Sequence, residues 1–351
     1  MEGYLLLADG MRLDGVLNGA PETAIGWLVA NTAVVGFQEM ITDPAYRGAI
    51  VAFTYPEVGS VGVAEQFSES AGVQAAGVLV KVLSEFRSHY QAEEDLEQML
   101  ADAGVPCLCG VDTRGVAVHL REEGEMAAAI APAEVDEAEL LDRLQGAGRP
   151  DYSPPQAGPR ARGDGGPEVA VLNLGIRRSE LAQLARGCRP EVLPADATAD
   201  DVLAAEPDGL FVSDGPGMTA PPQKAVQTVS ELVGRLPVLA AGLGHVALGA
   251  ALGCRLAFLK RGHHGVNCPV RNVQTGEVAV TSQRHSSVLD RGSVEDSPDV
   301  ELTHEHINDR TVEGIATADE TAVGLQFMPV PSEPGTVSAP IADFLANLGA
   351  E

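Results

Sequence analysis

Two short glycine-containing turns have the composition of sites that hold reactive groups. SDGPG spans residues 213–217 and GLGH spans 242–245, and each follows an apolar run and precedes a helical pattern. Small residues at such turns let backbone N–H groups converge on an anion or an oxyanion. Residues 237–253 have the outline of a nucleophile elbow, in which a reactive side chain stands between strand and helix. Here that position is Gly242, which has no side chain.

Other nucleophiles and a metal site are weaker candidates. Ser213 precedes a glycine turn and Cys268 lies near His264, but neither stands at the tip of an elbow. Five of the chain's eight histidines lie between residues 263 and 306, at positions 263, 264, 285, 304 and 306. His304 and His306 lack the i, i+4 spacing of a helical zinc site, and nothing fixes a ligand set. We expect no metal site and interpret these histidines as surface or loop residues.

The two turns fall at one edge of a predicted parallel sheet. Short apolar runs at 169–174, 209–213 and 237–241 alternate with helical patterns at 177–187, 223–235 and 244–253. Runs that are apolar on both faces and joined by helices predict a parallel sheet covered on both sides. Ligands of such sheets lie beyond the carboxyl ends of the strands, which is where both turns are expected.

The N-terminal half is expected to be mixed α and β. Residues 3–17 have the alternation and Asp-Gly turn of a hairpin, and 46–56 contain another β-rich run. Residues 92–104 have an acidic start, an apolar face and a glycine stop, which predict an amphipathic helix. The Gly- and Pro-rich stretch 146–167 disfavours regular structure, so we predict domains at 1–145 and 168–351 joined by this linker.

Composition excludes several classes of partner. The chain has 351 residues, which is long for one core, and only 4% are aromatic, so aliphatic cores are expected. A formal charge of −27 repels phosphate backbones and anionic lipid, so neither nucleic acid nor a membrane is an expected partner. Five scattered cysteines and the lack of a long apolar segment favour a reduced, cytoplasmic protein.

Five blocks in order resemble the small, glutamine-hydrolysing subunit of carbamoyl phosphate synthetase. They are residues 31–62, 110–124, 207–217, 242–253 and 262–270. The resemblance implies an N-terminal small-subunit domain that packs on a large synthetase subunit. It also implies a C-terminal class I amidotransferase domain with an open, mostly parallel sheet and helices on both faces. In that family a Cys, a His and a Glu release ammonia from glutamine for the large subunit, which makes carbamoyl phosphate for pyrimidine and arginine synthesis.

Carried over by position, the catalytic groups of this family are replaced. The nucleophilic Cys corresponds to Gly242, the catalytic His to Met328 and its Glu partner to Val330. The resemblance also places pocket residues at changed positions, and backbone amides at Gly215, Gly217 and Leu243. The changed pocket positions are Ala33, Val246, Arg284, Ser286 and Ser287. Without a thiolate no thioester forms, so the resemblance favours a chain that has lost glutaminase activity.

Three functions remain open from the sequence. The first is a glutaminase-dead partner of a synthetase large subunit or a similar synthetase, in a hetero-oligomer that uses free ammonia. This chain would then need no cofactor, and ATP and magnesium would be bound only by the large subunit. The second is an amidotransferase that acts through an unrecognised nucleophile, with Cys268, Cys254 and Ser213 as candidates. The third is a module repurposed to bind another metabolite or protein.

Overall fold

The chain forms two compact units. The computed structural model describes residues 1–153, 163, 165–327 and 336–348. The first unit comprises Met1–Asp151 with Lys260–Gly265, and the second comprises Tyr152–Leu259 with Val266–Glu351. The short segment from the second half of the chain belongs to the first unit through Glu125. The backbone N–H of Glu125 donates to the Lys260 carbonyl at 2.8 Å, and its carboxylate accepts from the Gly262 N–H at 2.6 Å.

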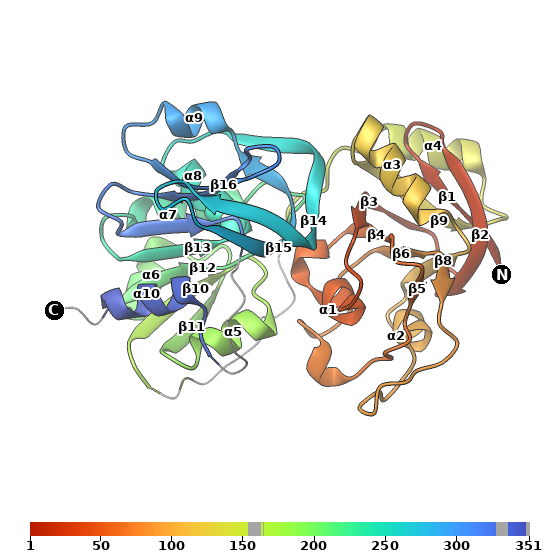
Figure 1. Cartoon of the computed structure of the whole chain (residues 1–351), viewed down its shortest axis with the longest axis horizontal. Helices are drawn as coiled ribbons and strands as arrows, with labels where there is room; N and C mark the ends of the chain where they lie inside the picture. The colour runs from red at the N-terminus through yellow and green to blue at the C-terminus, as the bar shows by residue number, and fades with distance from the viewer. Residues whose placement is uncertain (154–162, 164, 328–335, 349–351) are drawn as a thin grey trace. The chain divides into compact units, whose positions relative to one another are not determined.

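The first unit is built on a closed barrel with strand order β1-β2-β8-β6-β4-β3-β9 (Figure 1). Its strands are β1 (Glu2–Leu7), β2 (Arg12–Gly19), β3 (Ala24–Asn31), β4 (Ala49–Phe53), β6 (Gly77–Val80), β8 (Pro106–Cys109) and β9 (Met126–Pro132). Aliphatic side chains such as Leu5, Leu28, Leu79 and Leu108 fill the core of this unit. The predicted hairpin is confirmed as β1 and β2, which pair antiparallel. The β-rich run at 46–56 contains β4.

Helices and short segments connect these strands. They are α1 (Phe37–Thr42), η1 (Pro44–Tyr46), β5 (Glu57–Val58), η2 (Glu65–Phe67), β7 (Val82–Leu83), α2 (Leu96–Asp102), α3 (Thr113–Glu123) and α4 (Glu137–Gln145). The helix expected within 92–104 is confirmed, with Leu96 and Leu100 buried. It begins only at Leu96, because Asp95 is the N-cap residue and has extended backbone angles.

The second unit contains an extended sheet whose first part is parallel. β11 (Arg189–Pro194), β10 (Glu168–Asn173), β12 (Gly209–Val212), β13 (Val238–Ala241) and β18 (Ala322–Leu325) lie side by side in that order. Each neighbouring pair among them is parallel. The sheet continues through β17 (Val312–Ala316), β16 (Glu301–His306), β14 (Leu256–Asn272) and β15 (Val278–Leu289). Antiparallel pairing of β17 with β18 begins this extension.

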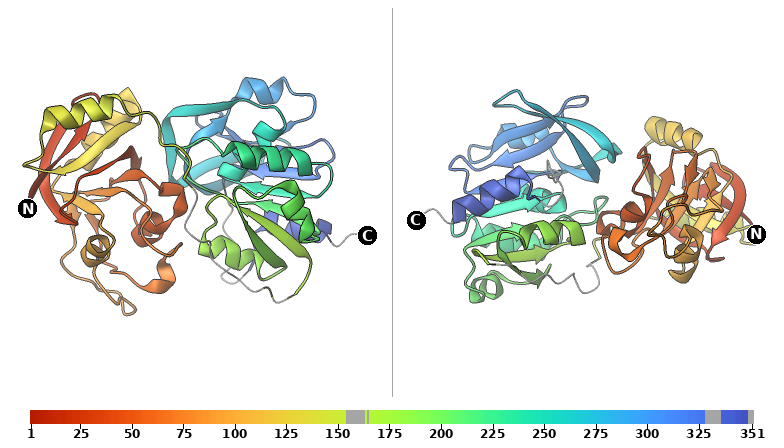
Figure 2. Two further views of the ribbon diagram at one scale, coloured as in Figure 1. Left: turned by 180° about the vertical axis from the view of Figure 1, so that it is seen from behind. Right: turned by 60° about the horizontal axis from the view of Figure 1, so that its bottom comes forward.

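Helices cover both faces of the parallel part, as the sequence predicted (Figure 1 and Figure 2). These helices are α5 (Arg178–Leu184), α6 (Ala199–Ala204), α7 (Gln223–Leu232), α8 (Leu243–Ala251) and α10 (Ala339–Leu348), while α9 (Arg291–Glu295) follows β15. On one face α6, α7 and α8 pack over side chains such as Leu210 and Val238. On the other face α5 and α10 pack over Phe211 and Leu239. Along the described residues, no helix has both the length and the apolarity that a membrane crossing requires.

Candidate functional site

The turn between β13 and α8 has the geometry of a nucleophile elbow. Ala241 ends the buried strand, and Leu243 begins the helix directly after Gly242. Gly242 has φ 54° and ψ −117°, a conformation that L side chains rarely adopt. A nucleophilic residue at this position would have a strained backbone, whereas glycine adopts the same conformation without a Cβ clash. The turn therefore keeps its shape but presents no reactive atom.

The carboxylate of Asp214 lies where a side chain of residue 242 would begin. A Cβ on Gly242 would stand 2.8 Å from Asp214 Oδ2 and closer still to Oδ1. Asp214 Oδ1 accepts hydrogen bonds from the backbone N–H of Gly215 at 2.8 Å and of Leu243 at 3.0 Å. Both amides come from the turns that the sequence identified as anion sites. In this structure the anion that they bind is the chain's own aspartate.

Arg284 completes this arrangement from β15. Its Nη2 lies 3.3 Å from Asp214 Oδ2, and the two side chains are only 10% and 12% exposed. Because both ions are shielded from water, their attraction is stronger than that of a surface pair. The guanidinium and the two amides together stabilise a buried negative charge at the tip of the elbow. This is an electrostatic arrangement for holding an anion.

Gly217 joins the second glycine turn to β15. Its carbonyl accepts hydrogen bonds from the backbone N–H groups of Ser286 and Ser287 at 2.8 and 3.0 Å, and from Ser287 Oγ at 3.1 Å. A Cβ on Gly217 would overlap the backbone of Arg284, so the close approach of the two segments requires glycine. The structure thus brings together six of the residues that the resemblance placed in a pocket: Gly215, Gly217, Leu243, Arg284, Ser286 and Ser287.

Two of the other positions from the resemblance, Val246 and Ala33, are among the described residues. Val246 is fully buried in the aliphatic core beneath α8. Ala33 belongs to the first unit, where its N–H donates to Asn31 Oδ1 at 2.7 Å. Met328 and Val330 lie outside the described residues. Asp214 was not identified from the sequence as a site residue, although it stands within the SDGPG turn, where only Ser213 and the glycines were considered.

The alternative nucleophiles Ser213, Cys254 and Cys268 differ in their hydrogen bonds and in their burial. Ser213 Oγ accepts from the Leu174 N–H at 3.0 Å and donates to the Asp214 carbonyl at 2.9 Å, so this hydroxyl fixes the turn. Cys254 is 6% exposed, and burial raises the pKa of its thiol, which favours the unreactive protonated form. Cys268 is partly exposed on β14. Neither Ser213 nor Cys254 has the surroundings of an activated nucleophile.

The interpretation of the histidines as surface or loop residues is wrong for three of the five positions. His264, His285 and His306 are 5%, 3% and 5% exposed. All five histidines lie on the strands β14, β15 and β16 rather than in loops, and these three face buried surroundings. His264 Nε2 lies 3.3 Å from the Glu125 carboxylate within the first unit. His245, in the elbow helix, is fully buried, and burial lowers its pKa to about 3, so its imidazole is neutral near pH 7.

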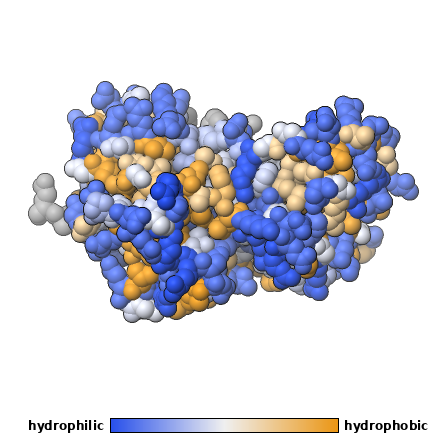
Figure 3. Space-filling model, turned by 90° about the horizontal axis from the view of Figure 1, so that it is seen from above, coloured by the Kyte–Doolittle hydropathy of each residue, from blue (hydrophilic) through white to orange (hydrophobic). Residues whose placement is uncertain are grey.

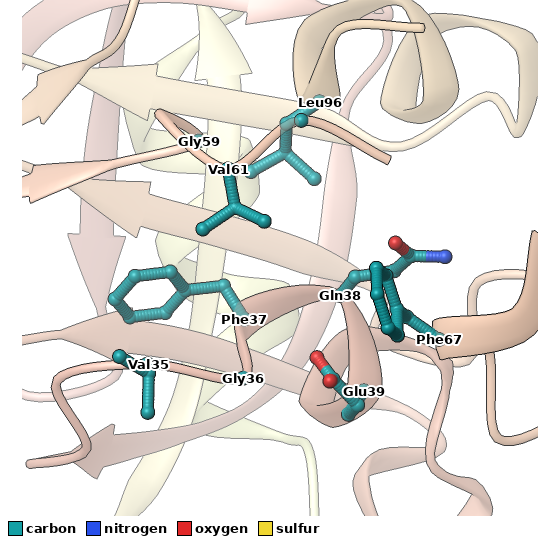
Figure 4. A pocket seen from close by; sticks show the side chains of 10 residues that line it. Val35, Gly36, Phe37, Gln38, Glu39, Gly59, Val61, Phe67 and Leu96 are labelled. Atoms are coloured by element: carbon teal, nitrogen blue, oxygen red, sulfur yellow. The ribbon is translucent and has the colours of Figure 1, made fainter. Parts of the chain in front are cut away.

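The first unit has an apolar pocket of about 240 Å³ beside α1. Figure 4 shows that Phe37, Val61 and Phe67 surround it, with Leu96 at its edge. Its full lining is Val35, Gly36, Phe37, Gln38, Glu39, Gly59, Val61, Gly62, Phe67 and Leu96. We call these residues, together with the adjoining Val34 and Tyr55, the α1 surface.

The α1 surface presents large apolar side chains to solvent. Val35 is 63% exposed and Val61 is 43% exposed. The ring of Tyr55, 40% exposed, lies 6.2 Å from the ring of Phe37. Hydrophilic residues cover most of the face of the molecule drawn in Figure 3, with hydrophobic residues exposed between them. Clustered exposed apolar residues are typical of protein interaction sites.

The parallel sheet, its two helical layers and the elbow define a class I glutamine amidotransferase domain. The family model described as Glutamine amidotransferase class-I matches residues 175–346. The model described as Carbamoyl-phosphate synthase small chain, CPSase domain, matches residues 5–130. A solved glutamine amidotransferase from Thermotoga maritima covers 51% of this chain and 80% of its own, with 16% identity and a TM-score of 0.36.

Relatives of known family span nearly the whole chain. The carbamoyl phosphate synthase small chain of Methanopyrus kandleri is 39% identical over 341 residues, covering 94% of each chain. That of Akkermansia muciniphila is 36% identical over 348 residues, covering 94% of this chain and 92% of its own. The chain belongs to the carbamoyl phosphate synthase small chain family.

Proposed function

We propose that this chain is a small chain without glutaminase activity that acts as a structural or regulatory partner of a synthase large subunit. The observation that carries this proposal is the Asp214 carboxylate, which accepts hydrogen bonds from the N–H groups of Gly215 and Leu243 in the space next to Gly242. The large subunit would then make carbamoyl phosphate from free ammonia and supply pyrimidine and arginine synthesis.

The chemistry of amide cleavage supports the loss of glutaminase activity. A glutaminase of this class needs a thiolate to attack the side-chain amide and N–H donors to bind the resulting oxyanion. Gly242 supplies no sulfur, and a second anion beside Asp214 would meet like-charge repulsion in a poorly solvated site. The chain's Met328 and Val330 also replace an imidazole and a carboxylate with side chains that cannot transfer protons.

A partner role is supported by the family and by the α1 surface. The relatives are named as small chains of a synthase, which implies that each works with a large chain of the same synthase. The α1 surface offers the exposed apolar side chains that the core of a stable interface requires. In this proposal ATP and magnesium are bound by the large subunit, and this chain needs no cofactor of its own.

The decisive experiment measures ammonia release from glutamine by the purified chain, with and without a large subunit from the same cells. A small chain that keeps Cys, His and Glu at the three catalytic positions serves as the positive control. We expect no release above the heat-treated blank, while the assembled complex makes carbamoyl phosphate from ammonium salts. Steady release of ammonia, together with an adduct of a glutamine-mimicking electrophile on Cys268, would instead support an unrecognised nucleophile.

The partner role is tested separately by changing the α1 surface. Val35→Glu and Val61→Glu place a charge on this surface and are expected to reduce co-purification of the large subunit by about tenfold or more. Val118→Glu is the matched control, because Val118 is 44% exposed on α3 and does not line the pocket. If the unmodified tagged chain retains no large subunit, the chain is better explained as a repurposed binding module.

A further inference from the structure

Two cysteines lie next to each other on one strand of the barrel. Cys107 and Cys109 are separated by one residue on β8, and their Sγ atoms are 3.8 Å apart. Successive side chains of a strand point to opposite faces, so both thiols lie on the face opposite Leu108, which packs in the core of the first unit. β8 pairs with β2 on one side and β6 on the other, which holds the two residues in register.

The two thiols are chemically unequal. Cys107 is fully buried, whereas Cys109 is partly exposed and can be reached by a small reagent. The hydrogen bond between the two thiols lowers the pKa of Cys109. The same hydrogen bond, together with burial, raises the pKa of Cys107. A reachable sulfur that ionises more readily, beside a buried protonated one, is the arrangement of an attacking and a resolving cysteine.

We propose that Cys107 and Cys109 form a site of reversible thiol oxidation, which reacts with low-molecular-weight disulfides. The Cys109 thiolate attacks one sulfur of the small disulfide, forming a mixed disulfide and releasing one small thiolate. The Cys107 thiol then loses its proton and attacks Cys109 Sγ, which releases the second small thiolate. The protein gives up two electrons and two protons, and the small disulfide is reduced to two thiols.

The position of the pair on a strand explains why the product should be easy to reduce. Two residues along a strand span about 6.6 Å, which is near the upper limit of about 6.8 Å for Cα atoms joined by a disulfide. A disulfide formed there bends β8 locally and has a more oxidising potential than an unstrained one. The bond is therefore suited to reversible modification rather than to permanent stabilisation.

The other cysteines are internal controls. Cys188 is buried, and burial raises the pKa of its thiol to about 11. Cys254 is also buried with a raised pKa. Cys268 is the other partly exposed cysteine and belongs to the second unit. A Cys268→Ser variant therefore separates oxidation at β8 from modification of an accessible thiol in general.

The test treats the full-length chain with oxidised glutathione, blocks remaining thiols by alkylation and identifies each cysteine by peptide mass spectrometry. We expect Cys107 and Cys109 to lose alkylation together, to appear as one internal disulfide and to recover fully with dithiothreitol. Cys107→Ser should instead accumulate a stable glutathione adduct on Cys109. Cys109→Ser should slow modification at position 107 by about tenfold or more, because Cys107 is buried. Cys268→Ser should leave the internal disulfide unchanged.

Two results would overturn the proposal. One is a glutathione adduct that persists on Cys109 in the unmodified chain, because Cys107 would then not act as the resolving thiol. The other is that Cys107 and Cys109 are alkylated after treatment as fully as in the untreated chain, while Cys268 is oxidised. Circular dichroism of each variant checks folding, and Cys107→Ala provides a second variant if the serine is not tolerated at a buried position. Glutaminase activity does not enter this test, so it stands apart from the proposed function.

Discussion

Replacing Gly242 by alanine tests whether Asp214 occupies the space of the missing side chain. The new Cβ would overlap the Asp214 carboxyl group, so the carboxylate must rotate away from the elbow. It would then lose its hydrogen bonds to the N–H groups of Gly215 and Leu243. Gly253, just after the same helix, is the matched control. It also has positive φ, at 86°, but a Cβ added there would meet no atom within 4 Å.

The expected magnitudes follow from these contacts. Gly253→Ala should lower the free energy of unfolding only through backbone strain, by about 1–2 kcal/mol for an L residue at positive φ. Gly242→Ala adds the lost hydrogen bonds to a charged acceptor, each about 1.5–3 kcal/mol, partly offset by new solvation of the carboxylate. We therefore expect Gly242→Ala to lower the free energy of unfolding by about 3–5 kcal/mol. In an Asp214→Ala background the steric part disappears, and the loss of unfolding free energy should fall to the backbone strain alone, about 1–3 kcal/mol.

The assay is urea unfolding followed by far-ultraviolet circular dichroism. Trp27, the chain's single tryptophan, lies on β3, so its fluorescence reports the first unit separately. Equal destabilisation by Gly242→Ala and Gly253→Ala would refute the packing of Asp214 against residue 242. So would a double variant whose loss of stability is the sum of the two single losses, because contacting residues are expected to couple.

Two further predictions concern the dependence of stability on pH. The pKa of His245 is lowered to about 3 by burial, while an unfolded imidazole titrates near 6.5, so the unfolded chain gains a proton first as pH falls. Stability should drop by about 1.4 kcal/mol per pH unit between these values, and His245→Asn should remove that slope in urea titrations. Hydrogen bonds from Arg271 and Arg291 lower the pKa of Glu305 in the folded chain. These hydrogen bonds therefore stabilise the fold above the pKa that Glu305 has in the unfolded chain, and this stabilisation is lost as pH falls through its folded pKa. Glu305→Gln should be less stable at pH 7 but should lose less stability than the unmodified chain on acidification, as read by thermal unfolding.

The fold of the second unit was predictable because its signals are local. The apolar run at 237–241 and the helical pattern after it became β13 and α8. The antiparallel extension through β14 and β15 was not predicted, since most residues of β14 are partly or fully exposed and most buried residues of β15 are polar, so neither strand has a strong apolar pattern. Residues 260–265 belong to the first unit through hydrogen bonds with Glu125, a long-range contact that composition and periodicity do not contain.

The site was predictable in outline but not in its central contact. The sequence identifies the turn at Gly242 and the glycines at 215 and 217, because glycine at a strand-to-helix turn has a recognisable conformational reason. It does not identify Asp214 as the acceptor for amides on two turns, since that depends on the side chain's rotamer and on the distance between two strands. The burial of His285 was missed for a similar reason, because strand pairing rather than local polarity decides it.

The position of the Asp214 carboxylate depends on the absence of a side chain at Gly242. Buried N–H groups need an acceptor, and those of Gly215 and Leu243 find one in the Asp214 carboxylate. That carboxylate fits only because residue 242 has no Cβ, and its charge is balanced by Arg284. A nucleophile introduced at position 242 alone would therefore displace the aspartate, leave two amides without their acceptor and separate an ion pair. A cysteine at position 242 therefore requires a change at Asp214 as well, so Gly242→Cys alone should yield a less stable chain that releases no ammonia from glutamine.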